Sequence, residues 1–506
     1  MYMPSFMGLH TAQRSLMAAQ AGMTVVNHNI ANANTAGYTK QRLELSQADP
    51  YQPPAPASGL IYQFGQGVQL DAVSRVRDGF LDNQFRYEQS KAGEFEFVNK
   101  TMTQVEDIVG EPSDQGLATS IQQLFDAVQD MANQPENLAS RSAFLQQAND
   151  MMYLFQQQGR QLLQLHGNLV GVQGQQDTLN ASQLGIAVAD FNTKLQNLAD
   201  LNNNISAVTA SAGSPNDLLD RRAQLLEELS LSADIIVEDL PNNLVRVSLG
   251  GQELVRGKLL LNELTLTVST EANAAGVPAR LTTSNSAVDI TDTITSGQLK
   301  GILDIAGNNP TVKSVMAVFD DINALFSSLT SSFNTLQASG RDLDGNLHNT
   351  GAASTIFSLK SSYPGTGPTL LHMELNPNLV DAPQRLALAA NDSSVTGGFS
   401  GGGDNRNALA MAGLRYTAMA GINNQSFEQF HQTVVARLGT NARSYQDRAT
   451  NQTNLLDELD ARRSSVSGVN MDEEAIDLMR YQRMYEAASK VIKSLDEMYR
   501  TIINMV

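Results

Sequence analysis

The side chains of this sequence that could carry chemistry are few and do not converge. Its six histidines, at positions 10, 28, 166, 348, 372 and 431, are scattered. None belongs to the His-Glu-x-x-His pattern that places two zinc ligands on one helix face. Cysteine is absent, which excludes thiolate metal sites, a cysteine nucleophile and disulfide bonds. We therefore expect no catalytic residues, no metal site and no cofactor.

Two acidic segments resemble functional patterns at first sight. The segment from Asp342 to Asn346 begins like a calcium loop. An EF-hand needs glycine at position six and glutamate at position twelve, and those positions hold Leu347 and Ala353, so a turn is the better interpretation. The cluster Asp472-Glu473-Glu474 lies where a helix should begin. A helix dipole favours negative charge in the first turn, so the cluster is explained without catalysis.

The composition excludes several classes of partner. The chain has 506 residues, with 52 acidic and 34 basic side chains and a net charge of −18. Binding to nucleic acid or to an anionic membrane needs clustered lysine and arginine, so we expect neither. No leader with a charged and then an apolar part opens the sequence, and no apolar run approaches the roughly 18 residues of a membrane span. If the protein is secreted, we expect a route without a cleavable signal peptide.

The C-terminal segment from Gly468 carries the pattern of a long helix. Asn470 stands at the expected helix N-cap, with Glu473 placed to complete a capping box. A coiled-coil seam is predicted by apolar or small residues at alternating three- and four-residue spacing: Tyr481, Met484, Ala488, Val491, Leu495, Met498, Ile502 and Met505. A second stripe follows at Leu478, Tyr485, Ile492, Tyr499 and Val506. Together they cover roughly half the helix, so we expect contacts with more than one neighbour.

The N-terminal segment carries a matching pattern. Its seam consists of Leu9, Ala12, Leu16, Ala19, Met23, Val26 and Ile30. Residues Ser5 to Ile30 would form a helix about 39 Å long at 1.5 Å per residue. The following Asn32-Ala-Asn34-Thr-Ala-Gly37 is typical of a helix end, because Asn and Gly tolerate left-handed backbone. We predict that the two ends of the chain pair. The alternative is that each packs on a separate part of a globular core.

Between the ends, long helical patterns alternate with two stretches of other character. Helical periodicity occupies residues 80–109, 141–166, 181–208, 298–337 and 427–465. A short helix is predicted over 215–230, with Asn216 or Asp217 as its cap. The proline-rich stretch 49–59 predicts a linker or exposed arm, and Asn308 to Pro310 predict an interruption. Within 231–295, apolar residues recur at every second position instead of with the helical period. The turn residues between these alternating stretches indicate β-hairpins.

These patterns predict a mainly α fold with β insertions, built from a terminal coiled coil, a rod of long helices and inserted β-rich domains. The division that we expect is as follows: residues 1–45 with 466–506 as the terminal coiled-coil domain; 46–230 with 296–340 and 404–465 as the helical rod; 231–295 as a β-rich insertion; and 341–403 as a second, small, irregular or β insertion.

Three segments also carry a resemblance. The stretch from Asn27 to Tyr38 resembles the N-terminal motif of the bacterial flagellar rod, hook and hook-associated proteins. Gly65-x-Gly-Val68 with Val73-x-Arg75-x-x-Asp78-x-Phe80 is similar to the segment that follows it in that family. The stretch from Gly468 to Ile492 resembles their C-terminal motif. The motif residues matched are Asn27, Asn29, Asn32, Asn34, Gly37, Tyr38, Gly468, Asn470, Asp472, Glu473 and Glu474.

The resemblance implies a non-enzymatic structural subunit of the flagellum outside the cell. Its terminal helices would form an inner tube with copies of itself in a ring. The assembly interface that we predict consists of Leu9, Leu16, Met23, Val26, Ile30, Leu478, Tyr481, Met484, Tyr485, Val491, Ile492, Leu495, Met498, Tyr499 and Ile502. The implied partners are the hook protein, a second junction protein, the flagellar type III export apparatus and a cytosolic export chaperone on the C-terminal helix.

Within that family, the helix from Asn216 to Arg222 and the form of the C-terminal motif favour the members that join hook to filament. The first alternative is the hook protein or another axial member with the same ends. The second alternative, from a different class, is a secreted adhesin or enzyme on a helical stalk, with its activity in the β insertions.

Overall fold

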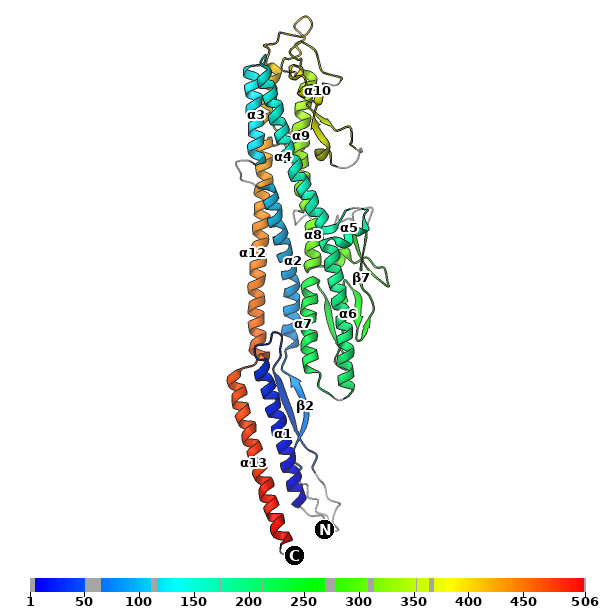
Figure 1. Cartoon of the computed structure of the whole chain (residues 1–506), viewed down its shortest axis with the longest axis vertical. Coiled ribbons are helices and arrows are strands. Elements are labelled where there is room, and N and C mark those ends of the chain that lie inside the picture. Colours follow the sequence, from blue (N-terminus) through cyan, green and yellow to red (C-terminus); the bar gives the residue numbers. More distant parts are fainter. Residues whose placement is uncertain are drawn as a thin grey trace.

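The computed structural model describes residues 5–50, 65–110, 116–172, 174–211, 213–268, 279–307, 314–351, 353–363 and 368–504. The chain forms a long rod of helices, with both of its ends at one end of the rod (Figure 1). The predicted mainly α fold with β insertions is confirmed. Residues 51–59 of the predicted arm and the predicted interruption at 308–310 lie outside the described residues.

The two ends of the chain pair with each other. Helices α1 (Ser5–Asn32) and α13 (Met471–Ile503) run antiparallel, side by side (Figure 1). A two-stranded antiparallel hairpin, β1 (Gln41–Gln47) and β2 (Val68–Arg75), packs along α1. The prediction of paired ends is therefore confirmed, and the alternative of separate packing on a globular core is wrong.

The rod is built on two long helices, α2 (Gly79–Val109) and α12 (Phe427–Ser467), which pack along each other. Asp78 starts α2 by accepting the backbone N–H of Phe80 at 2.9 Å, and Gly110 ends it in the left-handed conformation with φ of 61°. Ser426 and Gln429 form a capping box at the start of α12. These local signals set where the long helices begin.

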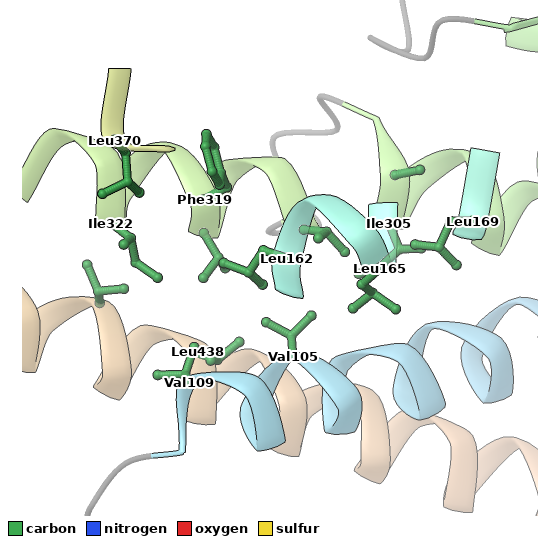
Figure 2. Packing of buried hydrophobic residues seen from close by; sticks show 14 of the residues in the cluster. Val105, Val109, Leu162, Leu165, Leu169, Ile305, Phe319, Ile322, Leu370 and Leu438 are labelled. Atoms are coloured by element: carbon green, nitrogen blue, oxygen red, sulfur yellow. The ribbon is translucent and has the colours of Figure 1, made fainter. Parts of the chain in front are cut away.

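The half of the rod far from the termini gathers more helices around one core. Four helices complete it: α3 (Leu117–Asn133), α4 (Leu138–Val170), α9 (Val315–Ser339) and α11 (Arg406–Gly413). Phe125 packs its ring 5.9 Å from Phe333 and 6.1 Å from Phe427, centroid to centroid. Figure 2 shows Leu162 and Leu165 pointing from one layer of helices toward another, with Val105 and Val109 opposite. Continuous burial of this kind makes the rod the stable part of the fold.

The first insertion lies on the middle of the rod. The helices that carry it are α5 (Gln176–Ala181), α6 (Gln183–Ala210), α7 (Asn216–Ser232) and α8 (Gln298–Ala306). An antiparallel sheet holds β3 (Ile236–Leu240), β4 (Leu244–Leu249), β5 (Gln252–Arg256) and β6 (Leu259–Leu260) in that order. A further hairpin joins β7 (Leu264–Val268) to β8 (Ala279–Thr283). Asn242 and Asn243 have φ of 62° and 58°, as the turn between β3 and β4 requires. The predicted hairpins are confirmed.

The second insertion is small and mostly irregular. Its regular elements are β9 (Phe357–Leu359), β10 (Met373–Leu375) and α10 (Pro377–Val380). Arg141 of α4, buried at 1% exposure, fastens it to the rod by donating to the backbone carbonyls of Pro383, Gln384 and Leu386. The division into domains stays a prediction, and its bounds at residues 45, 230 and 465 fall inside β1, α7 and α12.

Candidate assembly site at the paired ends of the chain

The pairing of α1 with α13 depends on small residues of α1. A Cβ placed on Gly22 would lie 2.5 Å from Cε1 of Tyr481, and one on Gly8 would lie 3.7 Å from Cδ1 of Leu495. Asn29 donates to the carboxylate of Glu474 at 3.0 Å. Gly8 and Gly22 are two heptads apart, as are their partners Leu495 and Tyr481. Gly22 and Asn29 are one heptad apart, as are their partners Tyr481 and Glu474, in the reverse direction of the chain. The two helices keep one antiparallel register along their length.

The seam on α13 draws on both predicted stripes. Ala488 is buried, and half-buried residues share its face at heptad spacing: Leu478, Tyr481, Tyr485, Ile492, Leu495 and Tyr499. Met484 is also half-buried, but Val491 and Met498 of the predicted seam are 49% and 56% exposed. The predicted seam is therefore rotated relative to the one observed. The backbone of Ile502 continues the helix, and the side chains of Ile502, Met505 and Val506 lie outside the described residues.

The seam on α1 differs in the same way. Ala12, Ala19 and Val26 are buried, as predicted for a seam. The larger predicted residues are only half-buried: Leu9, Leu16, Met23 and Ile30. Gly8, Gly22 and Asn29, which the apolar pattern did not select, make the contacts with α13. α13 thus lies close against a stripe of small residues.

A groove remains open between the two helices. It has a volume of about 630 Å³. Its lining is mainly apolar or small: Met7, Gly8, Thr11, Ala12, Ser15, Gly65, Met484, Ala487, Ala488 and Val491. Among the described elements, α13 packs chiefly on α1. Among the described residues, the outer face of the pair is therefore left largely exposed.

The motif residue Asn29 is the centre of a buried polar cluster. Its Oδ1 accepts from Tyr38 Oη at 2.7 Å and from the backbone N–H of Gln41 at 3.0 Å. Its Nδ2 donates to the carbonyl of Gln41 at 2.9 Å as well as to Glu474. All of its hydrogen-bonding groups are used, which compensates for its burial at 1% exposure. Burial, with the charges of Asp217 and Asp220, raises the pKa of Tyr38.

Lys40 connects this cluster to the first turn of α13. Its Nζ lies 2.9 Å from Glu473 and 3.3 Å from Glu474, and its backbone N–H donates to Ser467 at the end of α12. Burial alone would lower the pKa of Lys40, and its bonds with the two glutamates raise it overall. Asn470 caps α13, because its Oδ1 accepts hydrogen bonds from the backbone N–H groups of Asp472 and Glu473. Glu473 pairs with Lys40 rather than completing the predicted capping box.

The motif on α7 fastens the terminal pair to the rod. Asp220 accepts from the backbone N–H of Thr39 at 3.1 Å and from Arg75 Nη1 at 2.8 Å. Asp217 accepts from Gln41 Nε2 at 2.9 Å. Neither Asn216 nor Asp217 caps the helix, since Pro215 takes that position without a side-chain bond. The predicted cap is wrong because these side chains bond to the β1–β2 hairpin instead.

The other motif residues differ in their surroundings. Asn32 donates to the carbonyl of His28, and Gly37 has φ of 76°, as the turn after α1 requires. Asn27 and Asn34 are exposed. Gly468, with φ of −73°, separates α12 from α13 without left-handed backbone. Five contact residues were not predicted: Gly8, Gly22, Thr39, Lys40 and Gln41. Asp220 lies within the helix motif from Asn216 to Arg222, but its bonds were not predicted. The one signal that could have indicated these residues is that most of them lie close in the sequence to the N-terminal motif from Asn27 to Tyr38.

Other kinds of site are not found in the part of the chain that the structure describes. There, no three His, Asp or Glu side chains gather as metal ligands would. None of the described helices combines the length and apolar character that crossing a bilayer needs. Asp342 accepts hydrogen bonds from the backbone of Asp344 and Asn346 and pairs with His348 at 2.9 Å. It therefore holds a turn, as expected.

Known families match two parts of the chain. Residues 102–353 match the family described as "Flagellar hook-associated protein FlgK helical domain". Residues 462–505, which include α13, match "Flagellar basal body rod FlgEFG protein C-terminal".

Whole proteins and a solved structure are similar as well. Flagellar hook-associated protein 1 of Bacillus subtilis is 27% identical, over 99% of this chain and 98% of its own length. Those of Salmonella typhimurium and Escherichia coli are 25% and 23% identical, each over 98% of this chain and 99% of their own. The structure of the flagellar hook junction protein FlgK from Burkholderia pseudomallei has a TM-score of 0.60 and 17% identity, and covers 76% of this chain and 100% of its own. This last likeness supports the fold.

Proposed function

The chain belongs to the family of flagellar hook-associated protein 1, FlgK, and we propose that it joins hook to filament by packing its paired ends against those of neighbouring copies. It is a structural subunit of the flagellum, external to the cell. We propose that it has no catalytic activity. The residues of the predicted assembly interface that lie on the outer face of the α1–α13 pair would meet the next copy.

One observation carries this proposal: the terminal pair exposes apolar side chains that no described residue covers. Val491 and Met498 of α13 are 49% and 56% exposed, and Met17 of α1 is 57% exposed. Val491 also lines the apolar groove between the helices. Covering such surface is favourable by about 25 cal/mol per Å². A ring of copies, each covering its neighbour's open face, would use this energy for assembly.

The route to the flagellum and the other partners belong to the same proposal. The chain would leave the cell unfolded through the flagellar type III export apparatus. Before export, a cytosolic chaperone would cover the apolar face of α13. After export, the copies would contact the hook protein on one side and a second junction protein on the other.

A deletion strain tests the role. We expect cells without this protein to make hooks but no filaments, and to release unpolymerised flagellin into the medium. Electron microscopy of the cells and an assay of flagellin in the medium measure both. Restoration of filaments by the wild-type gene is the control. Normal filaments in the deletion strain would contradict the proposal. In wild-type cells, a long polymer of this protein, rather than a location limited to the junction, would favour the hook-protein alternative.

A pair of substitutions tests the surface. Val491→Glu with Met498→Glu places charge on the face that we propose neighbouring copies cover. Because both side chains are exposed in one chain, the helix content of the purified protein should not change. We expect the double variant to be exported and to restore fewer than a tenth of the filaments. Ile186→Glu on α6, at a side chain 61% exposed on the rod, is the matched control and should restore them fully.

A further inference from the structure

Four arginines surround a small cavity where the terminal pair meets the rod. The cavity has a volume of about 230 Å³ and lies between the start of α2, helix α7 and strands β3 and β4. The arginines that line it are Arg75, Arg77, Arg86 and Arg222, and we call it the arginine pocket. Two carboxylates also line it, Asp82 and the exposed Asp239.

Two of the arginines are neutralised within the chain. Arg75 lies 2.8 Å from Asp220, which is part of the fastening of α7 to the terminal pair. Arg77 pairs with Asp82 and lies 3.7 Å from Glu227. The carboxylate of Asp82 is therefore already paired. Asp82, Glu227 and Asp239 still attract Arg86, and Asp239 attracts Arg222, but none of these carboxylates forms an ion pair with either arginine among the described residues.

The other two arginines have no carboxylate partner among the described residues. Arg222 is 8% exposed and donates only through Nη1, to Asn202 Oδ1 and the carbonyl of Asn243. The half-buried Arg86 donates to Asn83 Oδ1. No described carboxylate oxygen lies within 4.0 Å of either guanidinium group. Nε and Nη2 of Arg222 are thus donors, in a nearly buried group, without a described acceptor.

Both groups keep their charge at neutral pH. Burial, reinforced by the nearby Arg75, Arg77 and Arg86 and only partly opposed by the charge of Asp239, lowers the pKa of Arg222 to about 10. Burial also lowers the pKa of Arg86. A buried cation without a partner is costly, and a carboxylate held by two guanidinium groups compensates that cost with short, charge-assisted hydrogen bonds.

We propose that the arginine pocket binds a carboxylate side chain of a neighbouring copy of this chain. A single carboxylate is small enough for the cavity and matches the planar donors of Arg86 and Arg222. With 52 acidic and 34 basic residues, each copy has carboxylates to spare. The pocket lies beside the terminal pair, where the proposed function places the neighbours. The identity of the neighbour rests on that function; the binding of a carboxylate does not.

The isolated full-length chain tests the pocket. Titration calorimetry with succinate, at an ionic strength fixed by sodium chloride, should show saturable binding. Arg86→Gln should weaken it at least tenfold, and Arg222→Gln should do the same if that variant folds. Arg246→Gln on β4, an exposed arginine paired with Glu238, is the matched control and should leave it unchanged. Absence of binding, equal binding by Arg86→Gln, or phosphate bound tenfold more tightly than succinate would overturn the assignment.

Cross-linking in the assembled junction tests the source of the carboxylate. Hooks from the deletion strain would be rebuilt with a mixture of unlabelled and ¹⁵N-labelled chains carrying Arg86→Lys, and treated with a carbodiimide. We expect cross-linked peptides that join an amine at position 86 of one isotope to an acidic residue of the other. Cross-links only within one isotope, only to another axial protein, or absent altogether would overturn the proposed neighbour. If the wild-type chain rebuilds no junction, the proposed function fails, separately from the pocket.

Discussion

Two adjacent glutamates at the start of α13 occupy opposite environments. The side chain of Glu473 is 62% exposed, and that of Glu474 is 2% exposed, although both pair with Lys40. Glu474 also accepts from Asn29, so it belongs to the buried cluster that holds the two ends of the chain together. Exposed ion pairs contribute little, whereas loss of a buried charge from a bonded cluster leaves its partners uncompensated.

We therefore expect Glu474→Gln to loosen the contact between α1 and α13, and Glu473→Gln to leave it nearly intact. The expected loss is about 1–2 kcal/mol for Glu474→Gln and below about 0.5 kcal/mol for Glu473→Gln. Hydrogen exchange of the first turns of α13 measures both. Amide exchange should become roughly 5 to 30 times faster in the first variant only. Equal rates in the two variants would contradict a special role for Glu474.

The raised pKa of Glu94 predicts that the stability of the rod depends on pH. Burial, and then the charge of Asp304, raise its pKa to about 7, while Lys300 and Arg448 act in the opposite direction. Between pH 4.5 and 7 the folded chain binds this proton and the unfolded chain does not, so the contribution of Glu94 to stability falls as pH rises through that window. Glu94→Gln keeps the neutral form at every pH and should remove the fall.

The measurement is the difference in unfolding free energy between Glu94→Gln and wild type, by urea at several pH values. We expect no difference near pH 4.5 and a variant more stable by about 1–2 kcal/mol at pH 8, a size that allows for partial exposure. Glu96→Gln, at an exposed position on the same helix, is the control and should show no such change. A constant difference across the pH range would show that Glu94 does not titrate in this window.

At the scale of elements, the sequence predicted the helices better than it predicted how they meet. The long helices follow from apolar periodicity and from end signals such as Asp78 and Ser426. The seam between α1 and α13 could not be predicted, because Gly8, Gly22 and Asn29 are invisible to a pattern of apolar residues. Bonds such as Asp220 to Thr39 and Arg75 join residues far apart in the chain, and only the folded structure brings them together.

The glycines of α1 give a matched test of that seam. Gly22→Ala would place a methyl group 2.5 Å from the ring of Tyr481, which must move, whereas Gly8→Ala would make an ordinary contact with Leu495 at 3.7 Å. Alanine favours a helix over glycine by roughly 0.5–1 kcal/mol at both positions. We expect Gly8→Ala to be neutral or stabilising, and Gly22→Ala to weaken the pairing by about 1–3 kcal/mol.

Hydrogen exchange in α13 and swimming of complemented cells measure this difference. Gly22→Ala should raise exchange near Tyr481 and reduce swimming, and Gly8→Ala should do neither. If the two variants behave alike, the close approach at Gly22 does not set the distance between the helices.

Burial is distributed very unevenly between the two ends of the rod. Along α13, among residues whose side chains are described, only Glu474 and Ala488 are buried, and the buried seam of α1 consists mostly of small residues. The rod has a continuous core of large apolar side chains. Fixing one residue costs about 1–2 kcal/mol, and burying a large apolar side chain returns roughly 1.5–3 kcal/mol. The paired ends should therefore open far more often than the rod.

Limited proteolysis of the monomer and of the assembled junction tests this unevenness. In the monomer we expect rapid trimming of both ends, with a core that begins near Gly79 and ends near Ser467 left intact. In the junction, where neighbouring copies would cover Val491 and Met498, the same sites should resist. Mass spectrometry of the fragments identifies the cuts, and Glu474→Gln should speed the trimming of the monomer. Ends that resist protease in a demonstrated monomer would mean that α1 and α13 are stable without neighbours, and the driving force for assembly would then have to lie elsewhere on the rod.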